Sequence, residues 1–279
     1  VLDGFVDEAK LKILKNQNAS FSGSGCLFNK SSQGFLPYLM EKMYDDRTEY
    51  KKKMKKAKKE LEAIKKNKDK HQNYVELVRQ KEAEISRNHN MQLAKKIQLN
   101  SAYGALSNQY FRWYDTQLAE SITVSGQLSI RFISNKINAY FNKLLKTVDV
   151  DYIIAIDTDS TYINMGPLVE RLCADKPVEE IVDFIDAFCE KHVSPFIDKS
   201  YQELADSMNA YQQKMEMGRE AIANKGVWTA KKRYILNMWD NEGVRYSEAE
   251  HKMMGIEAVR SSTPEIIRTF IKKAIFIIM

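Results

Sequence analysis

The sequence is poor in the residues that build disulfide scaffolds and zinc sites. It holds three cysteines, an odd number, and four histidines among 279 residues. No two cysteines stand in a CxxC spacing, and no two histidines lie close together in the chain. These absences argue against a disulfide-stapled domain and against a structural zinc site, and they favour a reducing compartment.

Long hydrophobic runs and a signal peptide are missing too. The chain begins at Val1 without a methionine, and its apolar end, PEIIRTFIKKAIFIIM, is too short and too charged to cross a bilayer. We therefore expect a piece of a longer protein that does not bind membranes.

Positive charge is concentrated in one stretch. Residues 45–70 carry the whole surplus of the net charge of +6, while the hydrophobic content of 44% is ample for a folded core. This lysine-rich stretch suggests a polyanionic partner, or else the solvated face of a helix with i,i+4 ion pairs.

Proline and glycine are absent from long segments that follow a helical pattern. Between residues 39 and 66, apolar positions from Tyr50 to Ile64 recur in steps of 4, 3, 4 and 3, the pattern of a helix that packs on one partner. A second helix is predicted from Tyr74 to Leu99, which makes an antiparallel hairpin, and a third from Thr116 to Leu145.

Shorter elements surround these helices. The pattern predicts a helix from Asp7 to Lys15, strands in CLFNK and GFLP, strands in YIIAI and TYINM, and helices at 168–174 and 178–206. Between residues 213 and 254, three strands are predicted, with the second running through TAKKRYIL. The expected fold class is α+β, an antiparallel sheet with helices into which the helical hairpin is inserted.

Two acids interrupt the strand pair around residue 158. Asp157 and Asp159 share one side of an extended chain, and unpaired carboxylates are costly to bury. A hard cation such as Mg²⁺ would suit them, because it takes one or two carboxylates and leaves its other positions to water and phosphates. The alternative is an ordinary Asp- and Ser-rich turn.

Polar residues on the two hairpin helices fall on shared faces. Lys96, Asn100 and Tyr103 stand at i, i+4 and i+7, so a cation, an amide and a phenol form one row that suits a nucleotide. Arg47 and Lys51 stand at i and i+4 on the other helix and add two cations.

A third group lies near the end of the chain. Lys231, Lys232 and Tyr234 are predicted on one strand, where Lys232 and Tyr234 share a face and can follow a nucleic-acid backbone.

Three of these segments, in order, carry a resemblance to a known family. IDTDSTY resembles motif C of the family B DNA polymerases, KIQLNSAYG resembles their K-x3-N-S-x-Y-G pattern, and KKRY resembles their K-K-x-Y element. The likeness runs from about Gly25 to Pro264 and is strongest to the replicative polymerases of T-even-type bacteriophages.

The resemblance implies template-directed DNA synthesis by a two-metal-ion mechanism. Asp157 and Asp159 would be the catalytic, metal-binding pair for two Mg²⁺ ions, with Ser160 and Glu220 as further members of the site. Arg47, Lys51 and Lys96 would hold the triphosphate of the incoming dNTP. Asn100 and Tyr103 would line the pocket of the nascent base pair. The residues that would hold the primer–template DNA are Lys231, Lys232 and Tyr234.

The resemblance also implies a division of the chain. Residues 1–37 would be a palm-proximal segment with short strands, 38–108 the fingers hairpin, 109–264 the palm, and 265–279 the truncated start of a thumb helix. The expected compartment is the cytoplasm of an infected bacterial host.

Parts of the family pattern are missing. The 279 residues hold no D-x2-S-L-Y-P-S motif, which supplies a further metal-binding aspartate, and no acidic signatures of the 3′–5′ exonuclease. We therefore expect this chain to be nearly inactive by itself and to need the remaining polymerase segments, with a sliding clamp as a further partner. It would be a fragment of a full-length polymerase or one part of a split polymerase.

Two rival hypotheses remain. A non-enzymatic, basic coiled-coil protein that binds nucleic acid explains the lysines but not Asp157, Asp159 and the Asn100 row. A reverse transcriptase would share the chemistry, but those enzymes usually carry adjacent aspartates, and Thr158 separates the two here.

Overall fold

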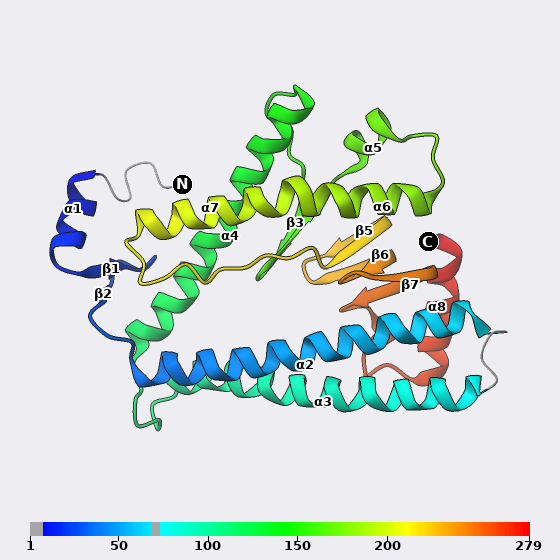
Figure 1. Cartoon of the computed structure of the whole chain (residues 1–279), viewed down its shortest axis with the longest axis horizontal. Helices are drawn as coiled ribbons and strands as arrows, with labels where there is room; N and C mark the ends of the chain where they lie inside the picture. The colour runs from blue at the N-terminus through cyan, green and yellow to red at the C-terminus, as the bar shows by residue number, and fades with distance from the viewer. Residues whose placement is uncertain (1–7, 69–72) are drawn as a thin grey trace. The chain divides into compact units, whose positions relative to one another are not determined.

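The computed structural model describes residues 8–68 and 73–279, so the beginning of the predicted segment 1–37 and the middle of the hairpin loop lie outside the described residues. The fold is α+β, with long helices and small antiparallel sheets (Figure 1). The chain divides into two compact units. The first runs to residue 54 and continues over 85–172 and 190–218, and the second comprises 55–84, 173–189 and 219–279.

The predicted helical hairpin is confirmed. Helix α2 spans Phe35–Lys66 and α3 spans Tyr74–Leu106, so each is longer than its pattern indicated. The two run antiparallel (Figure 1). Two ion pairs show this order: Lys95 on α3 pairs with Asp46 on α2 at 2.7 Å, and Lys81 on α3 pairs with Glu60 on α2 at 2.5 Å. Residues of the predicted apolar pattern that become buried are Met54, Ala57 and Leu61.

The predicted strand in GFLP is wrong. Its Phe35 begins α2, and Pro37 lies in the first helical turn, where a missing N–H costs nothing because no carbonyl precedes it in the helix. Strand β2, Leu27–Asn29, pairs instead with β1, Ala19–Phe21, which follows helix α1 at Glu8–Asn16.

Helix α4, Thr116–Leu145, has the predicted bounds and forms the core of the first unit. Asp115 caps it by accepting hydrogen bonds from the N–H groups of residues 117 and 118. One face buries Ile133, Ile137, Phe141 and Leu145, and α4 contacts strands β3 and β4 and helix α7.

The single helix predicted at 178–206 is interrupted. Helix α6, Val178–Phe188, gives way to a π-helical turn, Cys189–Val193, and then to α7, Ser194–Ser207. Pro195 explains the break, because its ring cannot donate the next helical hydrogen bond. A boundary between the two units falls within this π-helical turn. The preceding helix, α5, spans Gly166–Leu172.

The second unit holds a three-stranded antiparallel sheet in the order β5–β6–β7. Its strands are Ala221–Ala230, Arg233–Asn241 and Val244–Met254, so three strands are present as predicted. The bounds of the first two were wrong, because the predicted strand through TAKKRYIL is divided between β5 and β6 by the turn at residues 231 and 232. Beyond the 3₁₀ turn Glu257–Val259, helix α8, Glu265–Ile278, packs Ile275 against Ile235 of β6.

None of the described helices combines the length and the hydropathy that a membrane span requires.

Candidate active site

The two predicted metal ligands lie at the tip of a β-hairpin in the first unit. Strand β3, Ile153–Asp157, pairs with β4, Ser160–Ile163, so that Asp157 faces Ser160 and the turn consists of Thr158 and Asp159. The N–H of Asp159 donates to the carbonyl oxygen of Asp157 at 2.7 Å across Thr158, whose φ is 58°. This is the geometry of a γ-turn, and it is strained for a β-branched residue.

The turn changes how the two carboxylates are arranged. The expectation that they share a face assumed an extended chain through Thr158, and that assumption is wrong. Asp157 ends a strand and is half-buried, whereas Asp159 is exposed in the turn. Hydroxyl groups support the turn: Thr158 Oγ1 donates to Asp157 Oδ1 at 3.2 Å, and Ser160 Oγ donates to the Asp157 carbonyl oxygen at 3.1 Å.

The donor chemistry fits a hard divalent cation in part. Carboxylate oxygens are the ligands that Mg²⁺ takes one or two at a time, alongside water and phosphate oxygens. Within residues 8–68 and 73–279, no group of three or more His, Cys, Asp or Glu side chains is arranged to hold a metal ion. The two carboxylates of the hairpin are therefore fewer ligands than a complete metal site needs.

The predicted nucleotide row lies on α3 in the same unit. Lys96, Asn100 and Tyr103 are all exposed, with 39% of Tyr103 accessible to solvent. A Cβ atom at Gly104 would meet no atom within 4 Å, so the surface beside Tyr103 is open. The row can therefore receive a ligand from solvent.

Arg47 and Lys51 lie on α2, also in the first unit, and both are half-buried. The Nε atom of Arg47 is buried without a hydrogen-bond partner. Beside it in the sequence, Asp46 accepts a hydrogen bond from Lys95, which lowers the pKa of the Asp46 carboxyl group. This part of α2 thus combines fixed charges with an unsatisfied guanidinium N–H.

The remaining predicted residues belong to the second unit, and their placement on one strand is wrong. Lys231 and Lys232 form the turn between β5 and β6, with a φ of 60° at Lys232, and both are exposed. Tyr234 lies on β6 and is 4% exposed, with its ring 6.2 Å from that of Trp228. Lys232 and Tyr234 therefore do not share a strand face.

Glu220 directly precedes β5, and its Oε1 forms an ion pair with Lys252 Nζ on β7 at 2.6 Å. Its neighbour Arg219 pairs with Asp186 on α6 and with Asp240 on β6.

Sequence reasoning missed the rest of this network. Arg245 on β7 binds Asp240 at 2.9 Å, Asp183 at 2.8 Å and Asp186 at 3.2 Å. Asp240 is 1% exposed. An acid directly after the apolar-rich run YILNMW was the available signal, because such a residue needs partners when it is buried. The network ties α6 to the sheet.

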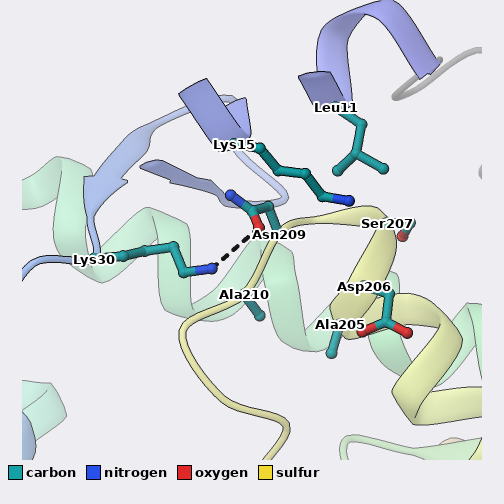
Figure 2. Close-up of a pocket in the computed structure, with 8 residues that line it drawn as sticks. All are labelled: Leu11, Lys15, Lys30, Ala205, Asp206, Ser207, Asn209 and Ala210. Carbon is teal, nitrogen blue, oxygen red and sulfur yellow. Dashed lines mark hydrogen bonds between the residues drawn. The ribbon is translucent and has the colours of Figure 1, made fainter. Parts of the chain in front are cut away.

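A cavity of about 420 Å³ is present in the first unit (Figure 2). Lys15 and Lys30 extend across it, and Lys30 Nζ donates to Asn209 Oδ1 at 3.1 Å (Figure 2). Its lining includes none of the residues predicted to bind metal, nucleotide or DNA. We assign it no part in the candidate site.

Three curated proteins that are similar in sequence to this chain are all named as DNA polymerases. A DNA-directed DNA polymerase of Enterobacteria phage T4 is 36% identical over 295 residues, which cover 92% of the chain and 33% of the phage protein. A DNA-directed DNA polymerase of Escherichia phage RB69 is 39% identical over 194 residues, or 66% of the chain and 22% of that protein. A DNA polymerase of Pyrococcus glycovorans is 29% identical over 161 residues, covering 57% of the chain and 17% of that protein.

The chain thus spans about a third of the length of the T4 relative that it matches. No protein-family model matches it.

Proposed function

Because this chain belongs to the family B DNA polymerases of the phage T4 type, we propose that it forms the fingers and part of the palm of an enzyme that copies DNA. The observation that carries this proposal is the β3–β4 hairpin, which presents Asp157 and Asp159 at a strained turn. A basic coiled-coil protein would not need such a turn, because strained backbone conformations cluster at functional sites.

Asp157 and Asp159 would hold Mg²⁺ together with ligands from outside this chain. When bound, two Mg²⁺ ions would activate the primer 3′-hydroxyl group and neutralise the leaving pyrophosphate. Ser160 keeps the Asp157 backbone in place through its hydroxyl group. Glu220, the further acid that the resemblance implies, belongs to the second unit, where its carboxylate pairs with Lys252.

The incoming dNTP would bind along the hairpin helices. Lys96, Arg47 and Lys51 carry the positive charge that a triphosphate needs, and the buried Nε of Arg47 is a donor in need of an acceptor. Asn100 and Tyr103 continue the α3 row toward the base pair. Fingers made of α2 and α3 would close on the correct nucleotide, so that selection comes from assembling the site.

Primer–template DNA would contact the turn between β5 and β6. Lys231 and Lys232 are exposed there and can neutralise backbone phosphates. Tyr234 is buried, so in this proposal it supports the turn from within the sheet, beside Trp228.

The fingers would correspond to residues 38–108, the palm to 109–264 with 1–37 as a palm-proximal segment, and the start of the thumb to 265–279. The proposed partners are the remaining polymerase segments, with the upstream aspartate motif, exonuclease and thumb, and a sliding clamp. The proposed DNA synthesis would take place inside an infected bacterial cell.

Primer extension tests the proposal. The chain would be assayed with Mg²⁺, by itself and mixed with a separately made segment that carries the D-x2-S-L-Y-P-S motif, each with an Asp159→Ala control. We expect extension in the mixture, none from the chain by itself, and none from the variant.

A mixture that forms a complex and yet extends no primer would contradict the assignment of Asp159. In that case, the alternative of a non-enzymatic DNA-binding protein would be favoured. An Asp159→Ala mixture that extends primers as well as the wild type would also contradict it.

A further inference from the structure

Two asparagines on α4 hold the chain segment that leads into the aspartate hairpin. We propose that Asn138 and Asn142 are positioning residues, which set the register of β3 and thereby the position of Asp157 and Asp159. They stand at i and i+4, so they lie on one face of the helix. This inference rests on the proposed function for its consequence in catalysis, but its structural part stands by itself.

Asn138 binds the last two residues before β3. Its Nδ2 donates to Asp151 Oδ1 at 2.8 Å, and its Oδ1 accepts from the Tyr152 N–H at 2.9 Å.

Asn142, one helical turn further on, binds both backbone groups of Val150. Its Nδ2 donates to the Val150 carbonyl oxygen at 2.7 Å, and its Oδ1 accepts from the Val150 N–H at 3.1 Å. The same oxygen accepts from Thr147 Oγ1 at 2.8 Å. A side-chain amide therefore pairs with this residue as a neighbouring strand would, because it carries one donor group and one acceptor like a peptide.

The segment between α4 and β3 needs such partners. Residues 146–152 form neither helix nor strand, yet their backbone groups must be satisfied. Apolar packing supports the end of this segment at Tyr152 but gives little support before it, since Val148 is 84% exposed and Val150 is 41% exposed. The asparagines supply the missing hydrogen bonds from a helix whose own position is secured by Ile137 and Phe141, which are 1% and 0% exposed.

Tyr152 connects α4 to both strands of the hairpin, through its buried ring and its backbone carbonyl group. It is 1% exposed, its ring lies 5.6 Å from that of Phe141, and its hydroxyl group shares a hydrogen bond with Thr147. Its carbonyl oxygen accepts from the N–H of Asn164, just beyond β4, at 2.7 Å. The hairpin is thus tied at its base, and Asp157 lies one strand length away.

Hydrophobic burial specifies the register of β3 weakly. Ile154 and Ile156 are 50% and 45% exposed, and the sheet has two strands. A shift by one residue would move every side chain of β3 to the opposite face, and a strand with both faces partly exposed resists such a shift poorly. The polar contacts of Asn138 and Asn142 therefore set where Asp157 and Asp159 lie.

The rival explanation is that the asparagines contribute to overall stability and nothing more. Two readouts separate the explanations in Asn138→Ala, Asn142→Ala and Asn142→Asp. The first is amide hydrogen exchange of residues 153–157 by NMR, compared with the amides of α4. The second is a titration with Mn²⁺ of the chain mixed with the segment that carries the D-x2-S-L-Y-P-S motif, followed by paramagnetic broadening of the Thr158 and Asp159 amide signals.

A matched control comes from the same helix. Ser134 is buried, and its hydroxyl group donates to the Ile130 carbonyl oxygen at 2.7 Å, away from the residues before β3. Ser134→Ala should leave both readouts unchanged. The two alanine variants should lose exchange protection in β3 selectively and should bind Mn²⁺ about tenfold more weakly, the usual effect of removing a group that orients metal ligands. Asn142→Asp keeps both accepted hydrogen bonds and should lie between alanine and wild type.

The outcomes also separate this inference from the proposed function. Unchanged β3 protection and Mn²⁺ binding in both alanine variants would overturn the positioning role and leave the polymerase proposal standing. Loss of protection across α4 as well as β3 would favour the purely structural explanation. No Mn²⁺ broadening at Asp159 in the wild type would count against the proposed function, while the exchange data would still decide whether the asparagines set the register.

Discussion

Thr158 adopts a backbone conformation that its own side chain disfavours. Its φ of 58° lies in the left-handed region, where a β-branched residue is strained. The strain is offset by the strand pairs on both sides of the turn and by the hydrogen bond from Asp159 to Asp157. At the scale of the residue, the candidate site is therefore marked by strain as much as by charge.

Replacing this residue tests the strain. Thr158→Gly should leave the free energy of unfolding unchanged or raise it by up to about 1 kcal/mol, since relief of one to two kcal/mol of strain exceeds the extra backbone entropy of glycine. Denaturant unfolding measures the change. The matched control, Thr161→Gly on β4, should lower the free energy of unfolding by about 1 kcal/mol, because its backbone is extended. Equal losses in the two variants would show that the turn is not strained.

The thiol groups provide a test of pH dependence. Burial raises the pKa of the Cys189 thiol to about 11, against a smaller lowering by Arg219. Hydrogen bonds with Ser24 and then Ser121 lower the pKa of the half-buried Cys26. Because the thiolate is the reactive form, at pH 8 on the order of one Cys189 thiol in a thousand is ionised.

Iodoacetamide labelling followed by peptide mass spectrometry should therefore modify Cys26 first. Labelling of Cys189 should accelerate about tenfold for each unit of pH between 7 and 9, since the thiolate fraction rises tenfold per unit far below the pKa. Cys189 labelling at the rate of Cys26 would contradict the burial described for it.

Among elements, helix α6 and the β5–β7 sheet depend on ion pairs that the hydropathy pattern does not reveal. Asp240 is 1% exposed and accepts hydrogen bonds from Arg219, from Arg245 at 2.9 Å and from the Gly243 N–H at 2.9 Å. Removing one member of such a network leaves buried charge uncompensated.

Asp240→Asn should lower the free energy of unfolding by about 3 kcal/mol, because two arginines lose their shared carboxylate. Asp183→Asn is the control, since its side chain is 71% exposed and also pairs with Arg245, and it should cost less than about 1 kcal/mol. Urea unfolding of both variants decides the question. A loss at Asp240 as small as at Asp183 would mean that the network is solvated.

Element boundaries show where local patterns were sufficient. The bounds of α4 could be predicted because Asp115 caps its start and one apolar stripe continues to Leu145. GFLP and TAKKRYIL could not be assigned correctly, since each lies where a turn residue competes with a strand-like sequence. In the first, a proline enters the first turn of a helix, and in the second, Lys232 takes a positive φ between paired strands.

At the scale of the whole molecule, two groups of lysines are candidates for the proposed contact with DNA. The net charge of +6 arises in the stretch around α2, whereas the proposed duplex contact is the turn at Lys231 and Lys232. Both places carry exposed lysines in the second unit, including Lys56 and Lys59 on α2.

Two variants of equal charge separate the possibilities. Lys231→Gln/Lys232→Gln and Lys56→Gln/Lys59→Gln each remove two positive charges. If the turn contacts phosphates, the first should lower the slope of log affinity against log salt by about 1.8, and the second should change it little. Fluorescence anisotropy with a primer–template duplex at several salt concentrations gives both slopes. The reverse result would favour the basic coiled-coil protein over the polymerase.

The sequence by itself determined the family, the α+β class and the long helices, because ordered motifs and continuous apolar stripes are local properties of the chain. It also singled out Asp157, Asp159 and the α3 row. The tertiary structure decided the strained turn between the aspartates, the burial of Tyr234, the partners of Arg219 and the hydrogen bonds of Asn138 and Asn142 to the residues before β3. Those features depend on residues far apart in the sequence or on a single backbone angle, and neither leaves a periodic trace.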